Sequence, residues 1–389
     1  MKKIIFVALI TLMAAALLSS CQEKSDDIPK RKTAAASTVK PEESQKNKEE
    51  KEDSTILATN STSVFNHETM KTASDGWAST ESKLFSINDN LAVDVTPETK
   101  NESGSLLNYY ALDENHIWLQ DEKTLFHSDN KGEDWKNYSL PGEMPRVEQI
   151  QLSFVTPQIG WLLVHRGAAA GHTPFDVYYT NTGGEKWVLD NNTTERTKLS
   201  LPDTIDPNSL LFIDEHTGFL TGEGNTDNES VFYRTNDKGK TWAVPRINIP
   251  EGQIISVGKP QFINTQTGFV AITSVSGEKT SSILFQSNDK GASWNSLIKL
   301  NDEINAVFFL NSKLGFLAFT INGKQTLQKT TDGGRTWSVV NEDMKSPLIS
   351  FHFVNEQEGF GIMDKDGYHA VTTKNGGHDW EDFKVDPES

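Results

Sequence analysis

From about residue 56 to residue 389, the chain alternates short apolar runs with clusters of Gly, Asn, Asp and Ser. Short runs in which apolar and polar residues alternate, bounded by such turn residues, are typical of β-strands. No ten-residue segment of this region carries apolar residues at helical spacing. The pattern therefore predicts an all-β domain over residues 56–389.

The stretch from residue 262 to residue 294 shows the pattern most clearly. Phe262 is expected in a first strand, residues 265–267 in a turn and residues 268–274 in a second strand. Residues 283–285 are expected in a third strand, and Trp294 is expected to open a fourth. The pattern predicts a repeating unit of four short strands.

An eight-residue window recurs along the body. It reads Ser or Thr, then Asp or Asn two positions later, Gly two after that and Trp three further on. The second copy has Thr182 in place of Asp or Asn, and a worn copy at residues 86–93 has Asn90 for the glycine and Val93 for the tryptophan. The clear copies, called the box windows below, cover residues 128–135, 180–187, 235–242, 287–294, 330–337 and 373–380.

A second signal precedes each box window: a glycine followed by an aromatic residue. Ile117-Trp118 fills one of these positions without its glycine. Successive aromatics are 41 to 58 residues apart, the shortest step being Trp77 to Trp118 and the longest Trp161 to Phe219. This period fits a four-stranded propeller blade. The glycine-aromatic pairs begin at Gly76, Gly160, Gly218, Gly268, Gly315 and Gly359.

Each residue type in the box window has a structural use. The Asp or Asn side chain can accept hydrogen bonds from backbone N–H groups in the turn between the third and fourth strands. The Gly adopts a φ that other residues resist, and the Trp buries a large ring, expected in the seam between neighbouring blades. We therefore predict a structural role, and no catalytic one, for Asn130, Gly132, Trp135, Trp187, Asp237, Gly239, Trp242, Asp289, Gly291, Trp294, Asp332, Gly334, Trp337, Asn375, Gly377 and Trp380.

The box windows resemble the Asp-box, or BNR, repeat of bacterial sialidases, sortilin-type receptors and photosystem II assembly-factor-like propellers. The resemblance covers about residues 65–385. It implies a β-propeller, with seven four-stranded blades as the expected count and six or eight as the alternatives. Because these families share blades rather than chemistry, the resemblance implies little about function.

The N-terminus carries a targeting signal. Lys2 and Lys3 precede an apolar run over residues 4–18, which is too short for a stable membrane span. We therefore expect a signal peptide over residues 1–20. The residues before Cys21 resemble the lipobox of bacterial lipoproteins, which implies that the Cys21 thiol is diacylated and becomes the new N-terminus. Cys21 is the only cysteine, so no internal disulfide can form.

Residues 22–55 contain almost no apolar side chains. Such a segment cannot bury enough surface to offset its ordering entropy, so residues 21–55 are expected to form a lipidated cysteine followed by a disordered tether. The predicted location is the extracytoplasmic side of a cell membrane, with the membrane itself as one partner through Cys21.

Charge and motifs narrow the function. The formal net charge of −17 and the pI near 5.0 argue against nucleic acid as a partner. The sequence has no His-x-x-His metal spacing, no Gly-x-Ser-x-Gly elbow and no phosphate loop, so no cofactor, metal or catalytic residue is predicted. A sialidase would need three convergent arginines, yet Arg335 lies inside a box window and Arg234 directly before one.

The remaining candidate site lies in loops. In a four-stranded blade, the first and third turns share one face, so longer second-to-third loops and inter-blade links are expected on the opposite face. The loop 165–174 is the most distinctive, and His165, Arg166 and His172 are candidate contacts for a ligand or partner; the alternative is a solvated loop. The predicted function is a non-catalytic binding or assembly scaffold for a protein or cell-envelope polymer. The alternative is a carbohydrate-active, sialidase-like glycosidase acting on envelope or host glycans.

Overall fold

The structure is a computed structural model of the 389-residue chain. It describes residues 67–384 except 81, 90, 99–107, 122–123, 142–149, 166–173, 193–200, 202–204, 224–230, 250–252, 278 and 322. The predicted signal peptide (1–20) and tether (21–55) lie outside the described residues. All described residues belong to one compact unit, residues 55–389. In the described part of the chain, no helix is long and apolar enough to cross a membrane.

The described residues form β-sheets, as the alternating pattern predicted, and every strand pair except β16 with β21 is antiparallel. Sheets A, B, C, E and F each contain four strands in chain order, and sheet D contains nine. The strands are, in sheet A, β1 (His67–Met70), β2 (Gly76–Ser79), β3 (Leu84–Asn88) and β4 (Leu91–Asp94); in B, β5 (Asn108–Ala111), β6 (Ile117–Gln120), β7 (Thr124–Ser128) and β8 (Lys136–Ser139); in C, β9 (Ile150–Phe154), β10 (Gly160–His165), β11 (Phe175–Thr180) and β12 (Val188–Asn192); in D, β13 (Asp206–Phe212), β14 (Gly218–Glu223), β15 (Phe232–Thr235), β16 (Arg246–Ile247), β17 (Gln253–Val257), β18 (Gln261–Phe262), β19 (Gly268–Ser276), β20 (Lys279–Ser287) and β21 (Ser293–Leu300); in E, β22 (Ile304–Phe309), β23 (Gly315–Ile321), β24 (Lys324–Thr330) and β25 (Ser338–Met344); in F, β26 (Leu348–Phe353), β27 (Gly359–Asp364), β28 (Tyr368–Thr373) and β29 (Glu381–Asp382).

Sheet D consists of two parts that β17 links. The first part is β13–β15, whose outer edge continues as a single bridge between Arg234 and Ala243. The second part is β18–β21, with the short strand β16 pairing in parallel with β21. The four strands predicted around residues 262–294 are confirmed, since they coincide with β18, β19, β20 and β21.

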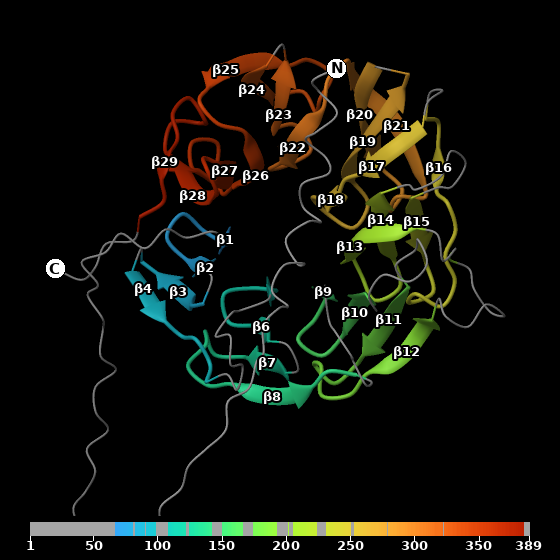
Figure 1. Cartoon of the computed structure of the whole chain (residues 1–389), viewed down its shortest axis with the longest axis vertical. Helices are drawn as coiled ribbons and strands as arrows, with labels where there is room; N and C mark the ends of the chain where they lie inside the picture. Colours follow the sequence, from blue (N-terminus) through green and yellow to red (C-terminus); the bar gives the residue numbers. More distant parts are fainter. Residues whose placement is uncertain are drawn as a thin grey trace, which may run out of the picture. The chain divides into compact units, whose positions relative to one another are not determined.

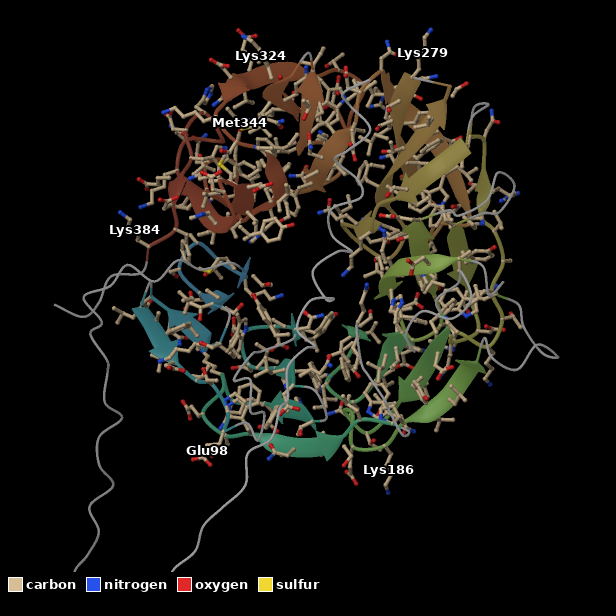
Figure 2. All side chains as sticks on the ribbon, in the orientation of Figure 1. Glu98, Lys186, Lys279, Lys324, Met344 and Lys384 are labelled. Atoms are coloured by element: carbon tan, nitrogen blue, oxygen red, sulfur yellow. The ribbon has the colours of Figure 1, made fainter. Side chains whose placement is uncertain are left out.

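The sheets follow one another around a ring, with the first strand of each sheet innermost (Figure 1). β5 packs beside β9, β9 beside β13, and β22 beside β26. β1 of sheet A packs against β27 and β28 of sheet F, so the last sheet meets the first and the ring closes. The charged side chains Lys186, Lys279 and Lys324 project outward from the rim (Figure 2).

Flat contacts between aromatic rings join consecutive sheets. Trp161 on β10 stacks on Phe212 at the end of β13, with ring centroids 3.5 Å apart and planes 1° apart. Phe269 stacks in the same way on Phe309, at 3.5 Å and 3°. The tryptophan of the box window then meets the same first-strand ring edge-on, as Trp242 does with Phe212 at 79°. We call these three rings the seam triad. Triads also form around Trp118, Phe154 and Trp187, around Phe219, Phe262 and Trp294, and around Phe316, Phe353 and Trp380.

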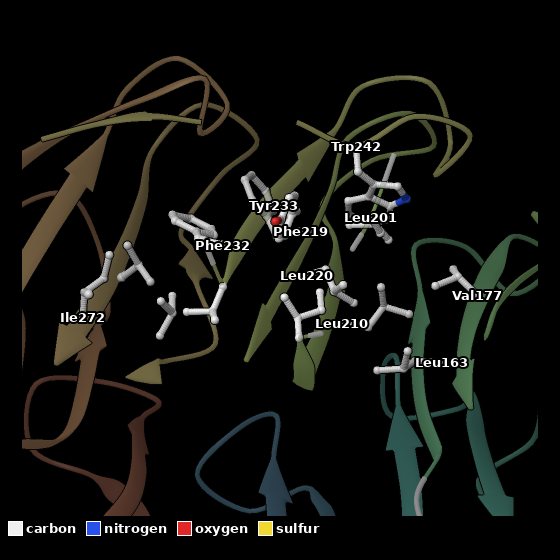
Figure 3. Packing of buried hydrophobic residues seen from close by; sticks show 14 of the residues in the cluster. Leu163, Val177, Leu201, Leu210, Phe219, Leu220, Phe232, Tyr233, Trp242 and Ile272 are labelled. Carbon is white, nitrogen blue, oxygen red and sulfur yellow. The ribbon is translucent and has the colours of Figure 1, made fainter. Parts of the chain in front are cut away.

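Aliphatic side chains extend the packing of each seam inward from the triad. Figure 3 shows the cluster between sheets C and D, where Leu163 and Val177 of sheet C lie near Leu210 and Leu220 of sheet D. All four side chains are fully or almost fully buried. Burial of this apolar surface is the main favourable term holding neighbouring sheets together.

Where the first strand ends in a phenylalanine, the glycine of the glycine-aromatic pair makes room for its ring. Gly160 lies directly opposite Phe154 in the pairing of β9 with β10. A Cβ at Gly160 would lie 2.4 Å from a ring carbon of Phe154, closer than atoms can approach. In sheet B, which has no such glycine, Ala111 lies opposite Ile117. The small residue has moved to the first strand, so the bulkier Ile117 fits without a clash.

The seam that closes the ring, between sheets F and A, lacks a triad. Phe360 on β27 is buried in one cluster with Met70 on β1, at the position where sheets C, D, E and F have a Phe ring. The worn box window of sheet A supplies Val93, which is 44% exposed, in place of a tryptophan. A cavity of about 470 Å³ lies at this seam, with Ala73, Glu358 and Phe360 among its lining residues. The closing seam is therefore packed less tightly than the seams that carry a triad.

A double-mutant cycle can test whether Gly160 must be small because the Phe154 ring occupies the space opposite it. Gly160→Ile should destabilise the domain severely, because its side chain overlaps the Phe154 ring, and Phe154→Ala should cost about 3–5 kcal/mol. The double variant reproduces the Ala111–Ile117 pair, so its loss should fall short of the sum by at least about 1 kcal/mol. Urea unfolding followed by circular dichroism measures each loss. Additive losses would show that the two residues do not share one space.

Candidate functional site

The box windows form closed hydrogen-bond networks. In the window that follows β15, the Asp237 carboxylate accepts the Thr241 N–H at 2.9 Å and the Thr241 hydroxyl at 2.6 Å. The Thr235 hydroxyl donates to the same carboxylate at 2.8 Å and accepts the Gly239 N–H at 3.0 Å. Gly239 has a φ of 97°, a conformation that a side chain would strain. Both carboxylate oxygens are therefore committed to the turn.

The same bonds set the protonation of these acids. The hydroxyl and N–H of Thr336 lower the pKa of Asp332 to about 2. For Asp237, burial acts to raise the pKa, but hydrogen bonds from Thr241 outweigh it and leave the pKa below its ordinary value. An acid held this far from neutrality is a poor general acid or base at physiological pH.

The windows that carry Asn follow a complementary pattern. The Asn130 Nδ2 donates to the Asp134 carboxylate at 3.0 Å, and the Asn375 Nδ2 donates to the Asp379 carboxylate at 2.9 Å. Where Asp occupies this position, Thr or Ser stands four residues later and donates instead, as Ser293 does to Asp289 at 2.6 Å. An amide is paired with an acceptor and a carboxylate with a donor, so each turn satisfies its own polar groups.

The box windows and the first turns of the sheets share one face, as the sequence predicted. The N–H of Gly183 donates to the Gln158 carbonyl at 2.8 Å, and that of Gly333 donates to the Lys313 carbonyl at 2.8 Å. Each bond fastens a box window to the turn between the first two strands of the same sheet. We call this face the box face.

The predicted contact residues of the loop 165–174 are placed only in part. His165 is the last residue of β10, and its side chain is buried. Its Nδ1 lies 3.8 Å from the Asp206 carboxylate of β13, in the seam between sheets C and D. Arg166 and His172 lie outside the described residues. The described part of the chain contains no group of three or more His, Cys, Asp or Glu residues that could hold a metal ion.

Side chains on several innermost strands form hydrogen bonds with the backbone of the neighbouring innermost strand. The Tyr110 hydroxyl donates to the Phe154 carbonyl at 2.8 Å, and Ser153 accepts the Phe212 N–H at 2.8 Å. Gln261 both accepts the Phe309 N–H at 2.7 Å and donates to its carbonyl at 2.9 Å. In the corresponding positions of β13 and β22 stand Leu211 and Phe308, whose apolar side chains cannot make such a bond.

A cavity of about 730 Å³ lies where Leu211 and Phe308 interrupt these hydrogen bonds between the inner strands. Its walls come from β13, β18, β22 and β26 and from the segments next to them, so it lies where the first strands of three sheets converge. Ile213, Asn264 and Thr265 place its outer part at the box face, and Lys259 belongs to its lining. We call it the axial cavity. The lining residues are Leu211, Phe212, Ile213, Lys259, Pro260, Gln261, Phe262, Ile263, Asn264, Thr265, Phe308, Phe351 and His352.

Sequence reasoning missed Lys259. A weak signal was present. Three positions before the other first-strand phenylalanines stand Gln151, Ser209, Ala306 and Ser350, whereas Lys259 stands three positions before Phe262. The signal can be read only after the strands have been aligned on their rings.

The chain resembles several solved structures in fold. No protein-family model matches it, and a comparison with curated protein sequences found no match. YCF48 from Cyanidioschyzon merolae aligns with a TM-score of 0.56 and 16% identity, over 82% of this chain and 97% of that one. An oligogalacturonate lyase from Vibrio parahaemolyticus gives 0.60 and 10%, over 80% and 89%. A GH74 xyloglucanase from Xanthomonas campestris gives 0.58 and 10%, over 82% of this chain and about half (54%) of that one. At such identities the likeness shows the fold alone: the described domain is a β-propeller.

The donor-acceptor rule of the box windows can be tested at Asn130. Asn130→Asp places a carboxylate against the Asp134 carboxylate and should cost about 1 kcal/mol at pH 7, and less at pH 4 as the pair becomes protonated. Adding Asp134→Thr recreates the pairing of Asp237 with Thr241 and should recover most of the loss. Urea unfolding at both pH values measures the effect. Asp129→Asn is the control, because the exposed Asp129 carboxylate pairs with Lys136 at the surface. A double variant no more stable than Asn130→Asp would contradict the rule.

Proposed function

We propose that this chain is a lipid-anchored, extracytoplasmic propeller that serves as a non-catalytic binding or assembly scaffold for a protein or cell-envelope polymer. The observation that carries the proposal is the axial cavity, open at the box face and walled by the first strands of several sheets. Mostly apolar cavities with a few polar groups are the usual form of ligand sites in proteins.

We also infer seven blades built on the Asp-box repeat. The two parts of sheet D support this count, because each begins with a glycine-aromatic strand pair and each carries its own box window, at residues 235–242 and 287–294. Counted separately, they join sheets A, B, C, E and F in one ring. The closed hydrogen-bond networks of the box windows support the assignment to Asp-box repeats.

The state of the acidic groups favours a scaffold over a glycosidase. A glycosidase needs two carboxyl groups flanking the scissile bond, one of them with a raised pKa. The box acids Asp237, Asp289 and Asp332 are engaged within their own turns, and the pKa of each lies below its ordinary value. Among the described residues that line the axial cavity, none is Asp or Glu.

A combined binding and turnover screen tests the scaffold role. The purified protein is applied to arrays of glycans, peptidoglycan fragments and peptides, and the same compounds are incubated with it and followed by mass spectrometry. Binding without conversion is expected, because the repeated acids are held ionised in turns. Conversion of any compound that is lost when the protein is unfolded would contradict the scaffold role and favour the glycosidase alternative.

Replacing Cys21, the residue expected to carry the lipid, tests the predicted membrane anchor. In cells fed an alkyne fatty acid, the wild-type protein should be labelled and sediment with membranes. Cys21→Ser should abolish the label and release the protein to the soluble fraction, because the thiol is the only acceptor of its kind in the chain. Ser20→Ala, which leaves the thiol in place, is the control. Unchanged membrane association of Cys21→Ser would contradict the lipid anchor.

A further inference from the structure

The polar groups around the axial cavity differ in how they are used. Gln261 is committed to the backbone of Phe309, and the Asn264 carboxamide oxygen accepts the N–H groups of Gln266 and Thr267 at 2.8 Å. His352 Nε2 lies 3.0 Å from the Met70 carbonyl oxygen across the closing seam. Lys259 makes no hydrogen bond or ion pair with any residue that the structure describes. The Lys259 ammonium is therefore available to bind a ligand.

The surroundings of Lys259 are those of a side chain in an open channel. The residue is exposed to solvent, yet the protein atoms packed around its ammonium remove part of its hydration and lower the pKa. No carboxylate of a residue that the structure describes offsets this cost. Elsewhere in the domain lysines find acids readily: Lys290 lies 3.0 Å from Asp214 and Lys329 lies 2.6 Å from Glu356. In a chain with 54 acidic and 37 basic residues, an unpaired lysine in a cavity points to an anionic ligand.

The apolar lining of the cavity limits which anions could bind there favourably. Leu211, Ile213, Phe308 and Phe351 present apolar surface around the cavity, and their burial by a ligand would be favourable. A phosphate or sulfate has no apolar part to place there. A volume of about 730 Å³ suits a ligand the size of a short peptide segment or a medium-length acyl chain.

We propose that the axial cavity binds an apolar chain end carrying a carboxylate, with the carboxylate on the Lys259 ammonium and the apolar part against Leu211, Ile213, Phe308 and Phe351. A peptide C-terminus and a fatty acid share this chemistry. The inference rests on the proposed binding function and names the site and the ligand class.

The test uses two pairs of probes and three variants. N-acetyl-Leu-Phe with a free carboxylate is compared with its amide, and decanoate with decanol, by isothermal titration calorimetry. The variants are Lys259→Met, Lys259→Arg and, as a control, Lys279→Met at the exposed hairpin between β19 and β20. The two pairs of probes distinguish a peptide ligand from a lipid ligand.

Loss of the charge pair should weaken binding of the acids about tenfold or more, whether the carboxylate or the lysine is removed. Lys259→Met should bind the acid and its neutral partner equally, Lys259→Arg should retain most of the difference, and Lys279→Met should match the wild type. Lys259→Met should not lower stability, because it removes a cation that has lost hydration.

Two outcomes overturn the inference. One is that neither acid binds; the other is that Lys259→Met binds an acid within twofold of the wild type. Either outcome leaves the scaffold role to its own screen, because a partner found there could contact another surface of the propeller.

Discussion

In most seams of this propeller, a flat contact between two aromatic rings fixes the spacing of consecutive sheets. One ring comes from the second strand of a sheet and the other from the end of the next sheet's first strand, as in Trp161 on Phe212. Such pairs contribute about 0.5–1.5 kcal/mol beyond the area they bury. The glycines, the box tryptophans and the inner-strand hydrogen bonds all depend on this contact, because each is placed around the first-strand ring.

The acids of the box windows belong to the turns of the blades and are not among the residues that line the axial cavity. The box windows with Asp237, Asp289 and Asp332 each place a tryptophan edge-on against a first-strand ring. Each of these acids is engaged by hydrogen bonds within its own turn, which lower its pKa and keep it ionised. At the axis, Leu211 and Phe308 interrupt the hydrogen bonds between the inner strands, and the axial cavity opens beside them. The regular repeats therefore build the frame, and the axial cavity lies at positions that depart from the repeat.

Much of the fold could be predicted from the sequence, because the box window and the glycine-aromatic pair are local patterns. The strands around residues 262–294 and the shared box face follow from them directly. The partner of each glycine could not be recognised, since Phe154 and Gly160 meet only once the strand register is known. That register also explains Ile117, an apparent defect of the motif that Ala111 compensates. Lys259 could not be identified from the sequence for a different reason. A cavity walled by several sheets depends on how the repeats assemble into the ring, and no single repeat contains it.

Hydrogen exchange followed by mass spectrometry tests the dependence on seam triads most directly. Strands packed by a triad should open only with the whole domain, whereas the closing seam, with Met70 in place of a ring, should open locally at lower free energy. We expect slower exchange in β10, β14 and β23 than in β2 and β27. Equal protection at all seams, or stronger protection at the closing seam, would contradict this expectation.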